Sequence, residues 1–323
     1  MEIMKLDAKD RQILYELDLN ARQSDSEIAK KCRLSREVVA YRINRLQKEG
    51  IVRGFLTILN HHALGYLCFR VFLKFRDVSG EQDKELVSFM KKNVAWIVRV
   101  RGNWSYNFMA FTANIFHFER FIQEFKEKFQ KNLVSMHFSL VTRIYHYRRA
   151  YLMAHEQDTS SYDVMGEAVQ VTQIDEIDLK ILDAIQNNGR LSSMEIAKKT
   201  AFTERIVRYR LRSLIDNKII LGFRAHLDLA ALELTYYKLH FKLNAFDKEL
   251  LKKIETYCHY HPDVVYKTDA IGGWDLELEL QVPSSKQLYM FIDTFTAQFP
   301  GIVNDCDILE YEKEFWLSYL NKV

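Results

Sequence analysis

The chain has 323 residues, of which 48% are hydrophobic and 28% charged, and its formal net charge is +3. This composition is ordinary for a soluble protein of two to four domains, and the 3 prolines and 11 glycines leave little room for disordered tails. No apolar run is long enough to span a bilayer and the N-terminus lacks the apolar region of a signal peptide, so we predict a cytoplasmic protein without a membrane partner.

The cysteines and the motif content exclude several classes of protein. The four cysteines show no C-x-x-C spacing, which favours reduced thiols; they are Cys32, Cys68, Cys258 and Cys306. Residues 258–261 read C-H-x-H, but no second ligand group lies at the spacing of a zinc finger, so we predict no metal site. The chain contains no P-loop, H-E-x-x-H, G-x-S-x-G or dinucleotide fingerprint. We therefore predict no cofactor and no enzymatic activity.

Three helices are predicted at the start of the chain. The first opens at Asp7 and Asp10 and supports the two that follow. Ser24 and Glu27 form an S-x-x-E capping box at the start of a short second helix, because the side chain of each residue can accept a hydrogen bond from the free backbone amide of the other. Ser35 is a favourable N-cap for the third helix. The buried positions of this third helix recur at spacings of four and three; they are Val39, Ile43 and Leu46.

The third helix has the character of a recognition helix. Gly50 lies where a glycine commonly ends a helix, and we predict a hairpin of two short strands as far as Asn60. With an apolar back and an arginine-bearing front, the helix suits a major groove, so residues 1–62 predict a winged helix-turn-helix unit. The candidate contacts to phosphates are Lys30, Lys31, Arg42 and Arg45, and the candidates for base edges are Arg36, Tyr41 and Asn44.

Residues 63–155 predict a domain of a different kind. Strands are expected at 67–75, 95–101, 105–112 and 135–147, with helices at 81–93 and 116–129. The order strand, helix, strand, strand, helix, strand is that of the ferredoxin-like fold. The polar, patternless stretch 156–172 is interpreted as a linker.

The first unit then returns, 168 positions later and without a gap, from Ser192 to Asp228. A fixed-period echo of this kind indicates a tandem duplication. We therefore predict a second winged helix-turn-helix over 173–231, a second ferredoxin-like ligand or dimerisation domain over 232–323, and an α+β fold overall. The candidate DNA contacts of the second unit are Lys198, Lys199, Arg205, Arg208, Tyr209, Arg210 and Arg212.

The two copies share a core but differ on the exposed faces of their recognition helices. The first copy has Arg36, Glu37, Ala40 and Asn44 where the second has Glu204, Arg205, Arg208 and Arg212. Two interpretations follow: two modules that prefer different DNA, or one reader and one clamp on the DNA backbone.

Both halves resemble the leucine-responsive regulatory protein/AsnC (Lrp/AsnC) family of transcription regulators. Residues 50–55, GIVRGF, followed by Leu59-Asn60 and Leu64-Gly65, match the wing and the exit into the family's ligand domain. The turn Gly272-Gly273-Trp274-Asp275 resembles that of its effector-binding domain. The resemblance implies a regulator that binds double-stranded DNA, associates through the sheet of the ligand domain into a homodimer or larger homo-oligomer, and senses a small effector such as an amino acid.

The same resemblance implies where an effector would bind. The residues concerned are Asp269, Gly272, Gly273 and Asp275, where a carboxylate would hold an amino group by a charge-assisted bond. The first half carries Ser105 in place of Asp275, so we expect no amino acid there. The alternative is that the glycines only form the turn and the aspartate caps it.

Duplication has a mechanical consequence, and two other functions stay open. Because a homodimer presents two reading helices related by symmetry, the fusion predicts a pseudo-dimer within one chain, while we still expect chains to pair.

The first alternative function is an enzyme that resembles siroheme decarboxylases, which share this architecture. The matching stretches 97–107 and 266–276 lack the histidine of that branch, which counts against it. In the second alternative, the winged units bind other proteins and have no affinity for DNA. The arginines of both recognition helices argue against this alternative.

Overall fold

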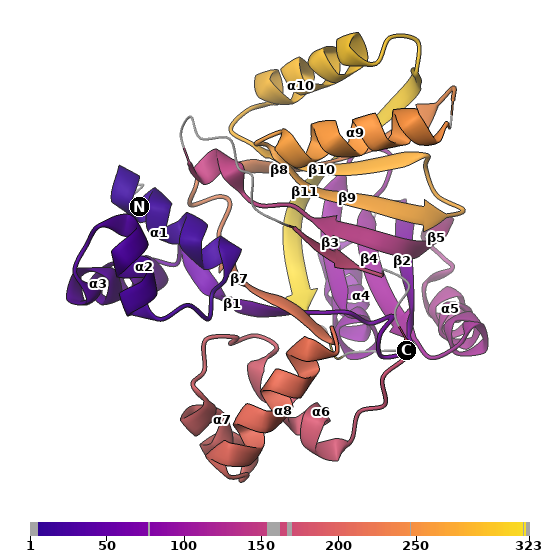
Figure 1. Ribbon diagram of the computed structural model, residues 1–323. Helices are drawn as coiled ribbons and strands as arrows, with labels where there is room; N and C mark the ends of the chain where they lie inside the picture. Colours follow the sequence, from indigo (N-terminus) through magenta and orange to yellow (C-terminus); the bar gives the residue numbers. More distant parts are fainter. Residues whose placement is uncertain are drawn as a thin grey trace.

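Each half of the chain has three helices and a strand, followed by a βαββαβ domain (Figure 1). The structure, a computed structural model, describes residues 6–76, 78–153, 162–166, 170–245, 247–318 and 320. The leading elements of the first half are α1 (Ala8–Leu19), α2 (Asp25–Cys32), α3 (Arg36–Lys48) and β1 (Val52–Leu59). Their counterparts in the second half are α6 (Glu176–Ile185), α7 (Ser193–Thr200), α8 (Glu204–Asp216) and β7 (Ile220–Leu227).

The two βαββαβ domains follow the same order as each other. The first comprises β2 (Leu67–Phe75), α4 (Gly80–Asn93), β3 (Trp96–Arg101), β4 (Tyr106–Thr112), α5 (Ile115–Phe129) and β5 (Leu133–His146). The second comprises β8 (Thr235–Leu243), α9 (Lys248–Tyr260), β9 (Val264–Ile271), β10 (Leu276–Val282), α10 (Ser285–Gln298) and β11 (Val303–Leu317). The predicted α+β fold of two helix-turn-helix units and two ferredoxin-like domains is confirmed.

The helix starts are those that the capping residues predict. The Ser24 hydroxyl accepts a hydrogen bond from the Glu27 amide at 3.2 Å, and the Glu27 carboxylate accepts one from the Ser24 amide at 2.7 Å. Ser192 and Glu195 repeat this box at the start of α7, with distances of 3.2 and 2.8 Å. Each box satisfies two of the amides that a helix leaves free at its N-terminus.

The wing hairpins predicted after the recognition helices are wrong. Each unit has one strand of eight residues, and β1 pairs antiparallel with β7 of the other unit, with Phe55 opposite Ala225 and Thr57 opposite Phe223. When two antiparallel strands are far apart in the sequence, no turn motif connects them. The pattern around Gly54 therefore indicates a strand but does not identify the strand that pairs with it. This ladder joins the two helix-turn-helix units and is the first contact that brings them together as the predicted pseudo-dimer.

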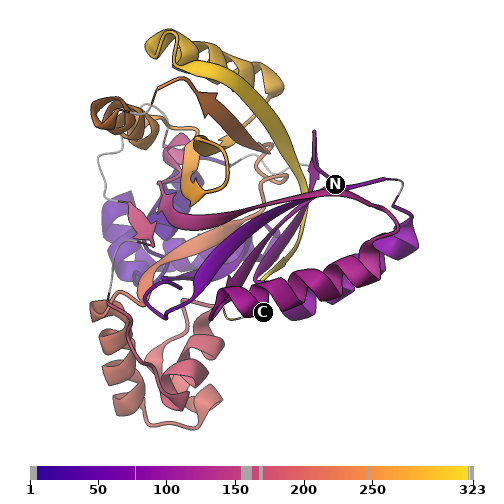
Figure 2. The same cartoon turned by 90° about the vertical axis from the view of Figure 1, so that its right-hand side faces the viewer.

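The eight strands of the ferredoxin-like domains close into a ring. Their order is β2-β4-β3-β11-β8-β10-β9-β5, and β5 pairs back onto β2. The two domains join where Val100 of β3 lies opposite Tyr311 of β11 and where Val141 of β5 lies opposite Ala270 of β9. Helices α4 and α5 cover one side of the strands and α9 and α10 the opposite side (Figure 2).

The inner faces of the two sheets differ in polarity. Alternate residues of β2 pack on α4 and α5, so Arg70, which lies between them, points into the ring. There the Arg70 guanidinium lies 2.8 Å from the Glu279 carboxylate of the other domain. Glu279 occupies the position that Met109 has in the first copy, and His240 the position of Phe72. The second sheet is therefore polar inside where the first is largely apolar.

A short strand lies within the range predicted as the linker. Residues 156–161 and 167–169 of that range are outside the described residues. Between them, β6 (Asp163–Met165) pairs with the end of β5, with Ile144 opposite Met165. Gly166 follows with a φ of +97°, and a Cβ there would lie 2.1 Å from the Thr142 carbonyl oxygen, so only glycine fits this close approach.

We expect the free energy of unfolding to fall as the pH drops below 6.5, because of a buried histidine. His146 is 4% exposed, and burial lowers its pKa to about 3, with the neighbouring Arg224 and Arg148 acting in the same direction. The unfolded chain binds a proton at this residue near pH 6.5 and the folded chain does not. The resulting loss of stability is about 2 kcal/mol by pH 5. Urea unfolding followed by circular dichroism at pH 7, 6 and 5 measures it.

The variant His146→Gln is expected to retain only the part of this loss that comes from the other histidines whose pKa burial lowers, which are His62, His137, His240 and His261. The exposed His117→Gln on α5 is the matched control and should keep the full loss. Equal losses in the His146→Gln and wild-type proteins would contradict the prediction.

Candidate DNA-reading surface

The recognition helices are positioned by the turns that precede them. Arg33 and Ala201, which end α2 and α7, have φ values of +53° and +59° and turn the chain toward the next helix. The Ser35 hydroxyl then accepts a hydrogen bond from the Val38 amide at 3.3 Å, and Thr203 caps α8 in the same way. The apolar side of each helix is buried, so its opposite side is left exposed; the buried residues are Val39, Ile43 and Leu46 in α3 and Val207, Leu211 and Leu214 in α8.

Two arginines bind the units to each other in a reciprocal way. The Arg22 guanidinium donates to the Gly189 and Leu191 carbonyls at 2.7 and 2.9 Å. Arg190, its counterpart in the repeat, donates to the Ala21 and Gln23 carbonyls at 2.6 and 3.1 Å, and these are the counterparts of the first two acceptors. Each contact is thus matched by its pseudo-symmetric equivalent. Together with the β1–β7 ladder, the arginines hold the two units in a pseudo-two-fold arrangement.

Most of the predicted DNA-contact residues are exposed on these helices. Tyr41 and Tyr209, at equivalent positions, are 67% and 71% exposed. The other exposed residues of the predicted set are Lys30, Lys31, Arg36, Asn44, Lys198, Lys199, Arg205, Arg208 and Arg212. Lys31 also lies 2.7 Å from the Glu16 carboxylate of α1. The structure therefore brings these side chains onto two surfaces, one on each unit.

The three arginines predicted to contact phosphate are instead paired with acids of their own unit. Arg42 lies 2.7 Å from Asp7 and 2.8 Å from Asp10, and Arg45 lies 2.6 Å from Asp10. Hydrogen bonds to Asp7 and Asp10 raise the pKa of Arg42. These ion pairs fasten α3 to the start of α1, and their contacts to phosphate stay a prediction.

The second unit repeats this arrangement at Arg210. Its guanidinium lies 2.8 Å from the Asp175 carboxylate and 3.2 Å from that of Asp178. These two acids also form the capping box of α6, so the pair fastens α8 to α6 as Arg42 fastens α3 to α1.

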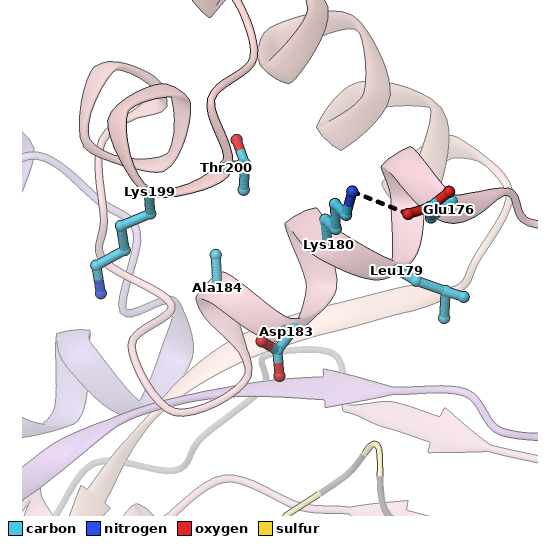
Figure 3. A pocket seen from close by; sticks show the side chains of 7 residues that line it. All are labelled: Glu176, Leu179, Lys180, Asp183, Ala184, Lys199 and Thr200. Atoms are coloured by element: carbon cyan, nitrogen blue, oxygen red, sulfur yellow. Dashed lines mark ion pairs between the residues drawn. The ribbon is translucent and has the colours of Figure 1, made fainter.

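A surface pocket lies between α6 and α7 of the second unit (Figure 3). It is lined by Glu176, Leu179, Lys180, Asp183, Ala184, Lys199 and Thr200. Lys180 and Glu176 form an exposed ion pair at 2.9 Å along one helix. The pocket has two lysines and two acids, so it offers no concentrated charge and no nucleophile paired with a base.

The turn predicted to bind an effector is held by its own chain. Gly272 has a φ of +82°, as a tight turn requires. The Asp275 carboxylate accepts a hydrogen bond from the Leu243 amide at 2.9 Å, and Ser105 accepts one from Phe75, the equivalent residue, at 3.1 Å. Serine and aspartate thus serve the same purpose in the two copies. This geometry supports the capping alternative.

Asp269 is likewise engaged by side chains of the protein. Its carboxylate lies 2.6 Å from the Lys267 ammonium and 3.5 Å from the Arg143 guanidinium, and it accepts a hydrogen bond from the Tyr145 hydroxyl at 3.2 Å. An effector amino group would have to compete with these partners.

The buried polar network inside the ring was not predicted. Lys238 lies 2.7 Å from Glu277 and 3.1 Å from Glu279, and all three are buried. Although burial raises it, Lys238 and Arg70 hold the pKa of Glu279 at about 2. The sequence does carry a signal, because LELELQV over 276–282 alternates strictly, which is typical of a strand with two different faces. Alternation cannot show that the polar face is covered by another sheet.

The described residues contain neither a metal centre nor a membrane-spanning helix. No group of three or more His, Cys, Asp or Glu side chains in the part of the chain that the structure describes is arranged to hold a metal ion. Among the same residues, no helix has the length and apolar character needed to cross a membrane.

Family models match a segment in each half of the chain, and known regulators match part of it. A family described as "Winged helix-turn-helix DNA-binding" matches residues 6–53, and the "AsnC-type helix-turn-helix domain" matches residues 174–215. The HTH-type transcriptional regulator LrpA of Bacillus subtilis is 32% identical over 132 residues, which are 37% of this chain and 88% of that protein. The HTH-type transcriptional regulator FL11 of Pyrococcus horikoshii is 29% identical over 129 residues, or 40% of this chain and 83% of that protein.

Solved structures of a siroheme decarboxylase match almost the whole chain. The siroheme decarboxylase NirDL has a TM-score of 0.64 and 12% identity, with 98% of this chain and 94% of that chain covered. At this identity the likeness shows a common fold and nothing about function. The regulators, in contrast, are similar in sequence over nearly their full lengths, and both helix-turn-helix units are matched. This chain belongs to the Lrp/AsnC family of helix-turn-helix transcription regulators.

Proposed function

We propose that this regulator binds duplex DNA with both helix-turn-helix units of one chain at the same time. The observation that carries the proposal is the reciprocal contact of Arg22 and Arg190, which fixes two exposed, arginine-bearing helices about a pseudo-two-fold axis. Helix-turn-helix dimers use this arrangement to place two recognition helices in successive major grooves. Here the covalent fusion supplies both helices, so DNA binding does not require a second chain.

The exposed side chains divide by chemistry into two roles. Lysines of α2 and α7 would contact phosphates, since an ammonium on a long stem pairs with phosphate without reading sequence. The side chains of α3 and α8 would reach base edges, where amide and guanidinium groups pair with specific bases. The first set is Lys30, Lys31, Lys198 and Lys199; the second is Arg36, Tyr41, Asn44, Arg205, Arg208, Tyr209 and Arg212.

The proposal also includes association of chains and binding of a small effector. The family resemblance implies association through the sheet of the ligand domain, and in this chain the two sheets are joined to each other in one ring. Association of whole chains would therefore use another surface, and light scattering of the purified protein measures it directly. An amino acid bound near Asp269 and Asp275 would appear in isothermal titration, and its loss in Asp275→Ser would locate it.

A second function is favoured by the fold over the whole chain. The siroheme decarboxylase NirDL has this architecture over 98% of the present chain. Adding siroheme to the purified protein and recording the Soret band tests this alternative. An unchanged spectrum removes it.

We expect DNA affinity to fall steeply with salt, and removing phosphate contacts to reduce that dependence. The double variant Lys198→Gln/Lys199→Gln should bind all duplexes more weakly and lower the slope of log Kd against log salt by about 1 to 2. Fluorescence anisotropy at several salt concentrations measures the slope.

The double variant Lys252→Gln/Lys286→Gln is the matched control, because it removes the same charge from exposed positions of α9 and α10 (Figure 1). An equal reduction of the slope in both double variants would count against contacts at α7.

The arginines of α3 are expected to separate into two classes. Arg42→Gln removes a partner of the buried Asp10 and should lower the free energy of unfolding by about 1 to 2 kcal/mol. Arg36→Gln changes an exposed residue and should leave stability within about 0.5 kcal/mol while weakening DNA binding. Urea unfolding and anisotropy on the same samples compare the two. A loss of stability in Arg36→Gln as large as that in Arg42→Gln would contradict the assignment.

A further inference from the structure

The pseudo-two-fold axis relates the backbones of the two recognition helices but not their exposed side chains. Tyr41 and Tyr209 are identical and exposed at equivalent positions. At four further positions that are exposed or partly exposed the copies differ: Arg36, Glu37, Ala40 and Asn44 in α3 correspond to Glu204, Arg205, Arg208 and Arg212 in α8. One framework therefore presents two different sets of hydrogen-bonding groups to DNA.

The charge of the helices argues against one reader and one clamp. With the internally paired Arg42, Arg45 and Arg210 set aside, α3 carries two cations and one acid, and α8 carries three cations and two acids, so the net charge is +1 on both. A backbone clamp would be the more basic of the two. The helices differ in the pattern of donors and acceptors, and that pattern is what distinguishes bases.

The first helix is suited to adenine. Asn44 is exposed on α3, and an amide can donate to N7 and accept from the N6 amino group of adenine at the same time. Glu37, also exposed, can only accept when ionised, which suits the amino group of cytosine and disfavours guanine, whose major-groove edge has acceptors only.

The second helix is suited to guanine. The Arg212 side chain is 86% exposed, and its ion pair with Asp216 is long, at 3.8 Å. Arg208 is 70% exposed and pairs with Glu204 along the helix, an interaction that contributes only about 0.3 to 0.5 kcal/mol in water. Both guanidinium groups can therefore exchange these partners for the O6 and N7 acceptors of guanine.

We infer that the DNA site of this protein consists of two unlike half-sites placed about a dyad, one read by α3 at adenine and the other by α8 at guanine. This inference rests on the proposed function. The β1–β7 ladder and the Arg22 and Arg190 contacts fix the two units relative to each other, while the side chains impose a direction. One chain then binds its operator in a single orientation, which a homodimer on a palindrome cannot do.

The test is selection from a pool of duplexes with a randomised core of about 24 base pairs, long enough for two half-sites one helical turn apart. The wild-type chain is expected to enrich a motif with two different halves. Asn44→Arg should change the enriched bases in one half only, and Arg212→Asn in the other half only. Both residues are exposed, so neither change disturbs the core, and Lys252→Gln on α9 serves as the control that leaves the motif unchanged.

Duplexes built from the selected halves complete the test. Anisotropy should give an affinity for the mixed duplex at least tenfold higher than for either duplex made of two identical halves, since each wrong base pair costs about 1 to 3 kcal/mol. A palindromic motif, a motif with a single half-site, or equal affinities would overturn the inference and leave DNA binding intact. Failure to enrich any duplex at low or near-physiological salt would overturn the proposed function itself.

Discussion

The buried carboxylate of Asp18 ties together the parts of this molecule that function requires to be fixed. Asp18 lies on α1 and is fully buried, and Arg224 of β7 donates to it from two nitrogens at 2.7 and 3.0 Å. Arg149, which follows β5, donates its backbone amide to the same carboxylate at 2.9 Å and pairs with it through its guanidinium. Burial raises the pKa of Asp18, but the two arginines hold it well below its usual range.

This ion triad lowers the stability of the fold unless all three of its members are present. An unpaired buried charge destabilises a protein by several kcal/mol, so loss of any one partner would loosen the contact between the first unit, the second unit and the ring. The Arg149 side chain also donates to Gln281 of β10 at 3.2 Å, which extends the connection to the second sheet. The relative placement of the recognition helices therefore depends on residues that do not touch DNA.

The two halves have diverged where they face each other inside the ring. Inside the ring, Arg70 of the first sheet meets Glu279 of the second, whereas the equivalents of these residues are Lys238 and Met109. A ring formed by two copies of the first sheet would place Arg70 opposite a methionine and leave its charge unpaired. A fused chain can carry different residues on its two inner faces, and α3 and α8 differ between the copies in the same way. The solved siroheme decarboxylase of the same architecture illustrates that the fold alone does not specify function, which lies in such sites.

The sequence by itself determined the starts of the helices, the buried side of the recognition helix and the duplication, which are local or repeated features. Capping boxes such as Ser24 with Glu27 marked helix starts, the 3.6-residue pattern of Val39, Ile43 and Leu46 marked the buried side of a recognition helix, and the 168-residue echo revealed the duplication. Only the tertiary structure decided which strand pairs with which, because pairing between residues far apart has no local signature. It joined β1 to β7 in place of two hairpins, and it turned Arg42, Arg45 and Arg210 toward acids on neighbouring helices. Helical periodicity places these arginines beside the buried stripe, but whether such a side chain meets DNA or an acid depends on a partner that the helix's own sequence does not contain.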